Sequence, residues 1–500
     1  MKRYIYLFVI LVLGISCEPD LLEEHAKGRM SPDVFYSSDQ MPQAADYLSS
    51  EFADVFSQAG CVGIHMGADD ISTLPGANKE KFREMDLFST TGDNDRIRLW
   101  WDNLYHTIRS ANAIIDNIDK STLSQAETND VLGTAYFYRA MSYSFLTRLF
   151  GEIPLVTEFS TSADLNIPRS SVTEVYAVIT DDLIKAEKLL PRKRPEKTSE
   201  PGGYPGAKPC KGTVKSLMSQ VYLTMAGWPL KQTSNYALAA KKAKEVIDSA
   251  DFYGYELQPN IFDLWTWENN YTNTEIIYGC YYNENGKLSM HGPLGGRPEE
   301  YQHPTVGWAI GWSDYLGEIS FFKRFPSGPR KDATYQTVIN IRGIGDVPWD
   351  DPRTNQQHPY IRKYQEEFPG SSWVGARTNQ VIRYAEILLN YAEAQDMADG
   401  APNAGAYDAI NAVRNRAGLP DLTPGLSGMD FRDSVIVERG WEFAGGEAAS
   451  RWFDLIRTET LEKATLLRDT HEIPLPHQPT KADYWLAIPD VDVAVTPSLQ

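Results

Sequence analysis

Hydrophobic residues recur at every third or fourth position through much of the first 250 residues of this 500-residue chain. That spacing places them on one face of an α-helix. The segment that begins at Met41, for example, carries Leu48, Phe52 and Phe56 on one side. We expect helices over residues 41–56, 100–119, 128–150, 172–190, 212–225 and 236–250.

Three further segments with the same spacing lie much later in the chain, over residues 383–398, 404–417 and 429–443. Pairs of such helices, with Ala and Tyr on their contact faces, recur at roughly 35–45-residue intervals and resemble tetratricopeptide units, although none matches that consensus closely. Units of this type stack into a scaffold with a broad binding surface. We therefore expect a mostly α fold with a tetratricopeptide-like helical hairpin scaffold over about residues 41–250 and 381–460.

Residues 251–380 break this pattern, because Gly, Pro, Asn and aromatic residues occur throughout and only short β-like runs remain, such as 275–282 and 337–341. Irregular stretches of this length are usually functional or disordered, and the aromatic content argues against disorder. We expect an irregular, loop-rich insertion with short β-strands, which binds the ligand. Residues 60–96 also lack a clear amphipathic pattern and predict another long loop.

The N-terminus has the pattern of an exported protein. Lys2 and Arg3 precede an apolar run over residues 4–14, which is too short to span a bilayer and has the length of a signal-peptide core. Cys17 follows in a context that resembles a bacterial lipobox, and an acidic stretch after it resembles a signal for export to the outer face of the outer membrane. We expect a signal peptide over 1–16, lipidation of Cys17 and an acylated tether over 17–40. The alternative is an ordinary signal peptide with Cys17 as an unmodified thiol.

Composition narrows the class of ligand. The chain has 48 Lys and Arg residues against 67 Asp and Glu residues, and its formal net charge of −19 argues against nucleic acid as a partner. It also argues weakly against highly acidic ligands. The four cysteines form neither a disulfide framework nor a zinc pattern. Aromatic residues make up 12% of the chain, and aromatic rings offer flat faces on which sugars stack, although most such rings fill protein cores.

No catalytic or metal-binding motif is present. The chain lacks His-Glu-x-x-His, Gly-x-Ser-x-Gly, a P-loop and a dinucleotide-binding fingerprint, and its eight histidines are scattered. We therefore expect no catalytic residues, no cofactor and no dedicated metal site. Asp69 and Asp70 lie in loop-like sequence, where they could bind sugar hydroxyls, hold a structural calcium ion or form a solvated turn.

Charged residues of alternating sign surround aromatic positions near the C-terminus. Such residues suit bidentate Arg–carboxylate pairs that hold one helix to another. A paired-carboxylate active site would instead need two acids facing an open cleft, and acids beside Arg keep low pKa values. We expect a structural role for the residues Glu438, Arg439, Glu442, Arg451, Asp454 and Arg457.

Several motifs occur in one order along nearly the whole chain. Residues 133–158 read GTAYFYRAMSYSFLTRLFGEIPLVTE, with Phe-x-Arg-Ala early in a helix and Phe-Gly-x-x-Pro-Leu at its end. Together with the lipobox, these motifs resemble the SusD/RagB family of outer-membrane glycan-binding lipoproteins. The other matching segments are 168–176, 383–386, 391–394, 410–419, 438–443, 451–457 and 487–489.

The resemblance implies a single SusD-like domain over residues 41–500 that binds oligo- or polysaccharide without catalysis. It implies a lipid-anchored protein on the outer membrane that faces the exterior, with a TonB-dependent SusC-like transporter as its partner. Ligand contacts in the family come from two regions, which correspond here to 64–100 and 281–315. Trp101, Trp441 and Trp452 lie on predicted helices and are assigned to the core. The candidate glycan contacts are Tyr282, Tyr301, Trp308, Trp312, Asp69 and Asp70.

Two other functions fit the same sequence. A surface glycoside hydrolase or lyase on an all-α toroid would also combine helical hairpins, aromatic residues and many acids. A SusD-like lipoprotein for peptide uptake would share the scaffold and differ only in its ligand.

Overall fold

In the computed structural model, the predicted signal peptide, Cys17 and Tyr301 lie outside the described residues, and so does the side chain of Trp308. Most of the predicted tether lies outside them as well. The structure describes residues 36, 39–56, 67–160, 166–194, 206–266, 269, 272–282, 302–303, 307–308, 312–341, 343–365 and 378–499.

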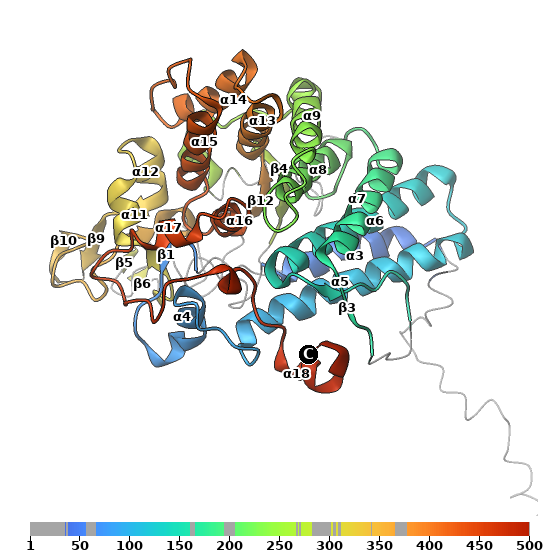
Figure 1. Ribbon diagram of the computed structural model, residues 1–500, viewed down its shortest axis with the longest axis horizontal. Coiled ribbons are helices and arrows are strands. Elements are labelled where there is room, and N and C mark those ends of the chain that lie inside the picture. Colours follow the sequence, from blue (N-terminus) through green and yellow to red (C-terminus); the bar gives the residue numbers. More distant parts are fainter. Residues whose placement is uncertain are drawn as a thin grey trace, which may run out of the picture.

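Long helices pack side by side along one half of the molecule (Figure 1). Each ends close to where the hydrophobic spacing predicts, and Ser124 and Ser171 begin two of them with capping boxes to Glu127 and Glu174. A capping serine of this kind is worth about 1 kcal/mol. This first helical group consists of α3 (Met41–Asp54), α5 (Asp95–Asn117), α6 (Gln125–Phe150), α7 (Val172–Leu189), α8 (Lys211–Ala226), α9 (Asn235–Ile247) and the short α10 (Ala250–Tyr253).

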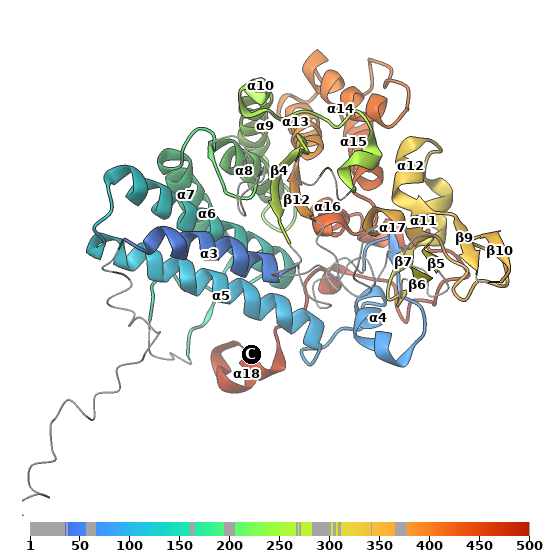
Figure 2. The same ribbon diagram turned by 180° about the vertical axis from the view of Figure 1, so that it is seen from behind.

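A second helical group packs against the first although more than 100 residues separate them in sequence. Its first helix contacts both α8 and α9, so the two groups form one layered helical body (Figures 1 and 2). The prediction of a mostly α, tetratricopeptide-like scaffold is confirmed. This group consists of α13 (Tyr384–Asp399), α14 (Ala404–Arg416) and α15 (Gly428–Glu442), followed by α16 (Ser450–Arg457), α17 (Leu461–Thr465) and α18 (Asp490–Val495).

The loop-rich part carries short antiparallel strand pairs, as predicted. Strand β4 (Ile276–Cys280) pairs with β12 (Asn379–Arg383) and joins the two helical groups, while β9 (Val338–Ile341) and β10 (Gly345–Pro348) form a hairpin at the edge of the molecule (Figure 1). The other pairs in the described part of the chain are β1 (Ile71–Ser72) with β7 (Leu316–Gly317), β2 (Ile153–Pro154) with β3 (Arg169–Ser170), β5 (Gln302–His303) with β6 (Gly307–Trp308), and β8 (Tyr335–Gln336) with β11 (Tyr360–Ile361).

Three short helices lie where the hydrophobic spacing predicts none. Helix α4 (Glu80–Asp86) buries Phe82 and Met85, so the expectation of one long loop over residues 60–96 is wrong for this segment. Helices α11 (Ile319–Arg324) and α12 (Pro329–Thr334) lie in the loop-rich part. Each spans only six or seven residues, which is less than two full turns and too short for a clear periodic signal.

Buried ion pairs join the helices of the second group, as the charge pattern predicts. The Arg439 guanidinium donates to Asp454 Oδ2 at 2.7 Å, and that of Arg457 donates to both oxygens of Glu393 at 2.5 and 2.7 Å. Burial alone would raise the pKa of Asp454, but Arg439 and Arg457 beside it hold that pKa below its usual value. A second cluster surrounds Arg383 at the end of β12. These acids are structural.

Most tryptophans on the helices are in the core. Trp101 and Trp452 are each 4% exposed, as expected, whereas Trp441 is only partly buried against the core. Among the described residues, no helix combines the length and the apolar content needed to cross a bilayer.

Candidate functional site

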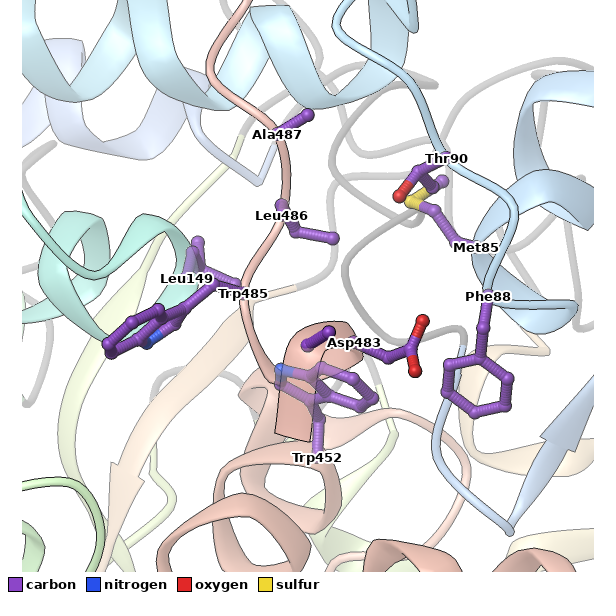
Figure 3. Close-up of a pocket in the computed structure, with 10 residues that line it drawn as sticks. Met85, Phe88, Thr90, Leu149, Trp452, Asp483, Trp485, Leu486 and Ala487 are labelled. Carbon is purple, nitrogen blue, oxygen red and sulfur yellow. The ribbon is translucent and has the colours of Figure 1, made fainter. Parts of the chain in front are cut away.

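A pocket of about 320 Å³ opens where the C-terminal segment crosses the helical body. Its walls come from four parts of the chain: the turn after α4, the end of α6, helix α16, and the segment 482–487 (Figure 3). The residues that line it are Met85, Phe88, Thr90, Leu149, Trp452, Ala482, Asp483, Trp485, Leu486 and Ala487.

Backbone hydrogen bonds hold the C-terminal segment across the pocket. The Leu486 amide donates to the Leu149 carbonyl at 2.7 Å, and the Asp490 amide donates to the Gly92 carbonyl at 2.8 Å. Gly151, with φ of 72°, ends α6 directly beneath the Trp485 ring, where a Cβ atom would lie 2.6 Å from that ring. The absence of a side chain at Gly151 therefore lets Trp485 lie flat on the helix end.

Three aromatic residues line the pocket, Phe88, Trp452 and Trp485, and the Trp485 ring points toward the end of α6, away from the other two rings (Figure 3). Phe88 and Trp452 stack with their ring centroids 6.4 Å apart and their planes 28° apart. Trp485 packs on Trp228 at 4.7 Å and is partly exposed. Phe88 has φ of 54°, a left-handed conformation that costs a phenylalanine about 1 kcal/mol or more. The fold tolerates this strain, and the result is a ring that covers one wall of the pocket (Figure 3).

Asp483 supplies the one ionisable side chain among the ten lining residues. Its Oδ2 accepts a hydrogen bond from the Thr480 amide at 2.7 Å, and its Oδ1 lies 3.1 Å from Nε2 of His477. The carboxylate lies between Trp452 and Phe88 in the view of Figure 3. Because carboxylate oxygens have about four lone-pair positions, Asp483 retains capacity to accept from a ligand hydroxyl.

Asp69 and Asp70 do not form a solvated turn, and that interpretation is wrong. Asp69 accepts two hydrogen bonds from the Arg451 guanidinium at 2.6 and 2.9 Å. Asp70 is fully buried, and its Oδ2 accepts from the Gly445 and Gly446 amides at 2.7 and 3.2 Å. Asp69 therefore connects the residues before β1 to α16, and Asp70 connects them to the loop before α16. Asp69 also borders a second, very small pocket that shares Phe88 with the first.

The other predicted contacts are spread over the loop-rich part. Tyr282 is 3% exposed, and its hydroxyl donates to the Ala53 carbonyl at 2.9 Å, so its ring is part of the core. Trp312 is partly buried against the core. Trp308 belongs to strand β6, where only the backbone is described, and Tyr301 lies outside the described residues. None of these residues lines the described pocket.

Metal binding finds no support among the described residues, because they contain no group of three or more His, Cys, Asp or Glu side chains suited to hold an ion. The expectation that the protein binds no cofactor stays a prediction, and the alternative of a structural calcium ion stays open.

Two family models match the chain. Residues 247–492 match the model of the SusD family, and residues 68–223 match a model described as starch-binding associating with outer membrane. The chain belongs to the SusD/RagB family.

Similar SusD-like proteins match over nearly their whole length. SusD-like protein P2 from Formosa agariphila is 25% identical over 521 residues, which covers 98% of this chain and 97% of that protein. The surface glycan-binding protein A from Bacteroides uniformis has a TM-score of 0.77 at 19% identity, covering 92% of this chain and 98% of its own. A laminarin-binding SusD-like protein has a TM-score of 0.74 at 20% identity, covering 91% and 97%. At these identities the solved structures share the fold.

The sequence analysis did not single out most of the residues that line this pocket. Phe88 and Thr90 lie within the region 64–100 that the resemblance assigns to ligand contact. Trp452 was assigned to the core, which is correct for most of its surface. Residues 482–486 carried no signal of their own, and Ala487 entered only as the first residue of a segment that resembles the family. Their shared position beside α6 depends on contacts between segments more than 300 residues apart.

The protein is expected to be more stable at mildly acidic pH than at pH 8. Burial raises the pKa of Asp70 to about 6 and that of Glu318 to about 7, and the net effect of its partners raises the pKa of His358 against the opposing effect of burial. Groups with raised pKa values contribute stability that is fully present below their ordinary pKa and is lost as pH rises to the raised value, which covers about pH 4 to 7 for Asp70 and Glu318. Below about pH 4.5 the trend reverses, because acids with lowered pKa values, such as Asp454, take up protons.

Thermal melts between about pH 3 and pH 8 measure this profile, and we expect a maximum near pH 4 to 5. The variants Asp70→Asn and Glu318→Gln keep an acceptor oxygen but remove the ionisable group. Asp70→Asn should therefore flatten the fall between about pH 4 and 6, and Glu318→Gln the fall between about pH 4.5 and 7. A melting temperature that rises steadily to pH 8 in the unmodified protein would contradict the assignment.

Proposed function

We propose that this protein binds oligo- or polysaccharide at the cell surface, without catalysis, in the pocket between Phe88, Trp452 and Trp485. The observation that carries the proposal is a pocket with three aromatic rings and one carboxylate. Sugars present flat C–H faces that pack on aromatic rings, and their hydroxyls donate to carboxylates. Membership of the SusD/RagB family and similarity to glycan-binding proteins support the same function.

The pocket favours binding over hydrolysis. Glycoside hydrolysis generally requires two carboxyl groups that flank the scissile bond, whereas the described lining residues include one, Asp483. The acids that the sequence concentrates near the C-terminus, such as Asp454, are engaged in buried ion pairs. Release of new reducing ends or unsaturated products from a polysaccharide by the purified protein would overturn this part of the proposal.

Delivery to a transporter completes the proposal. Lipidation of Cys17 would anchor the protein to the outer membrane facing the exterior, and the acylated tether would place the helical body beside a TonB-dependent SusC-like transporter. Bound oligosaccharide would then pass from the pocket to the transporter. Co-purification of a SusC-like barrel with the full-length protein from membranes tests this step, and the variant Cys17→Ala should leave the protein outside the membrane fraction.

Two aromatic variants test the pocket itself. Phe88→Ala and Trp485→Ala should each weaken glycan binding by about tenfold or more, because stacking on one ring is worth about 1–3 kcal/mol by analogy with nucleic-acid bases. A glycan array that includes laminarin oligosaccharides, probed with the soluble protein, identifies a ligand. Calorimetry with that ligand then gives the dissociation constant, which we expect in the micromolar range. Phe252 is exposed on α10, so Phe252→Ala is the matched control and should bind normally.

The same assay tests the loop-rich region. Trp308 and Trp312 remain proposed contacts from the second region that the resemblance indicates, and Trp308→Ala and Trp312→Ala measure their contribution. Unchanged affinity in Phe88→Ala and Trp485→Ala, with a loss in the variants of the loop-rich region, would move the site away from the pocket. Unchanged affinity in all four variants would overturn both placements. Binding of peptide pools but of no glycan would favour the peptide-uptake function.

A further inference from the structure

The side chains that line the pocket are not those expected of a binding site for an acidic ligand. Arg and Lys are the usual partners of carboxylate and sulfate groups, but the ten residues that line the pocket include neither. Asp483 supplies a negative charge, and apolar side chains surround it on both sides, including Leu486 and Trp452 (Figure 3). The pocket therefore presents one negative side chain and no positive one.

The cations near the pocket are already paired with acids. Arg468 Nη1 and Nη2 lie 2.9 Å from the two carboxylate oxygens of Asp86. Arg324 lies on the neighbouring small pocket, 3.9 Å from Asp69. Lys481, the residue before Ala482, pairs with Glu459 on the outside. A ligand anion would have to compete with these carboxylates.

Asp483 is held in position by its local structure. Residues Lys481–Tyr484 form a short 3₁₀ helix, and the Thr480 side chain and amide both bond to the Asp483 carboxylate at its start. The ring of the neighbouring His477 lies 3.1 Å from the Asp483 carboxylate, and its side chain is 46% exposed.

We propose that Asp483 makes this pocket selective for uncharged sugars, with exclusion of uronic acid and sulfated residues. The inference rests on the proposed function, since it assigns a substrate class to the same pocket. An anionic sugar ring packed against Phe88 in this pocket would bring its charge close to the Asp483 carboxylate, and like charges repel. An uncharged ring would instead donate a hydroxyl to that carboxylate.

Binding of paired ligands tests the selectivity. An uncharged gluco-oligosaccharide and an oligouronate of the same length are titrated into the soluble protein at about pH 8, where the uronate carboxyl groups are charged. We expect the uncharged ligand to bind at least tenfold more tightly. In Asp483→Asn, whose amide oxygen can still accept from the Thr480 amide, this ratio should fall by about tenfold. Asp433 is exposed on α15, so Asp433→Asn makes the same change in net charge and should leave the ratio unchanged.

A second variant keeps the test independent of the 3₁₀ helix. Ala487 is exposed at the pocket edge and takes no part in that helix, so Ala487→Arg adds a cation to the wall and should raise the affinity for the oligouronate at least fivefold. Equal or tighter binding of the oligouronate by the unmodified protein would overturn the selectivity while leaving glycan binding intact. If a full glycan array shows no binding, the proposed function itself fails.

Discussion

Replacement of Arg383 by methionine is expected to lower the free energy of unfolding by about 3–5 kcal/mol, the usual cost of removing one partner from a buried ion pair. The Arg383 guanidinium is almost completely buried at the end of β12. It donates to Glu275 at 2.5 Å, to Glu442 at 2.9 Å, and to both oxygens of Glu447, one of them at 3.1 Å. Methionine fills part of the same volume but donates no hydrogen bond.

The cost arises from the three carboxylates that Arg383 serves. Burial alone would raise the pKa of Glu442, but Arg416, Arg383 and Arg330 together hold that pKa well below its usual value. Without Arg383, these acids must either stay charged with fewer donors or take up a proton, and both outcomes destabilise the fold. Chemical denaturation followed by circular dichroism measures the loss.

Arg353 provides the matched control for this variant. It also forms a two-point pair with a carboxylate, since it donates to Asp351 at 2.8 and 2.7 Å, but its side chain is 55% exposed. Exposed pairs contribute at most about 1 kcal/mol, so Arg353→Met should change the free energy of unfolding little. If Arg383→Met were no more destabilising than Arg353→Met, the buried cluster would not be the connection that this structure indicates.

This cluster explains why distant segments form one body. Glu275 precedes β4, Glu442 ends α15, and Glu447 lies in the turn before α16, so a single guanidinium joins the β4–β12 pair to the second helical group. The turn that carries Glu447 leads directly into the helix that presents Trp452 to the pocket. The ion cluster therefore also supports one wall of the proposed binding site.

The long helices could be predicted from sequence because each presents several turns of apolar residues to the core. The segment predicted over 172–190, for example, is α7 at Val172–Leu189. The short helices could not, since α4 offers only Phe82 and Met85 as buried apolar positions, too few to distinguish a helix from a loop. The charge pattern identified the ion pairs because alternating charges beside buried aromatic residues require partners.

The candidate site was less predictable for a different physical reason. Asp69 looks like a turn residue in sequence, and its partner Arg451 lies 382 residues further along the chain. No local pattern connects the two. The pocket has the same property, since Phe88, Leu149 and Trp485 meet only after the C-terminal segment folds back across α6. Of the two ligand-contact regions that the family resemblance indicates, one, 64–100, contains Phe88. The resemblance could indicate it because it carries information about the whole fold.

Gly151→Ala is expected to lower the free energy of unfolding by about 3 kcal/mol and to weaken glycan binding by at least tenfold. The Gly151 backbone has φ of 72° and ψ of −115°, outside the region that alanine tolerates. The added Cβ would also lie 2.6 Å from the Trp485 ring. Trp485 cannot move away easily, because Trp228 packs against it at 4.7 Å. Overpacking of this kind typically costs about 1–3 kcal/mol in addition to the backbone strain.

The variant Gly400→Ala separates the two effects of Gly151→Ala, which are backbone strain and displacement of the Trp485 ring. Gly400 ends α13 with φ of 77°, and a Cβ atom there would meet no other atom within 4 Å. Gly400→Ala should therefore cost only about 1 kcal/mol of backbone strain and leave glycan affinity unchanged. Denaturation and calorimetry on both variants distinguish strain from displacement of Trp485. If Gly151→Ala bound glycan as tightly as Gly400→Ala, Trp485 would not be part of the binding surface, because its ring is the group that the new methyl must displace.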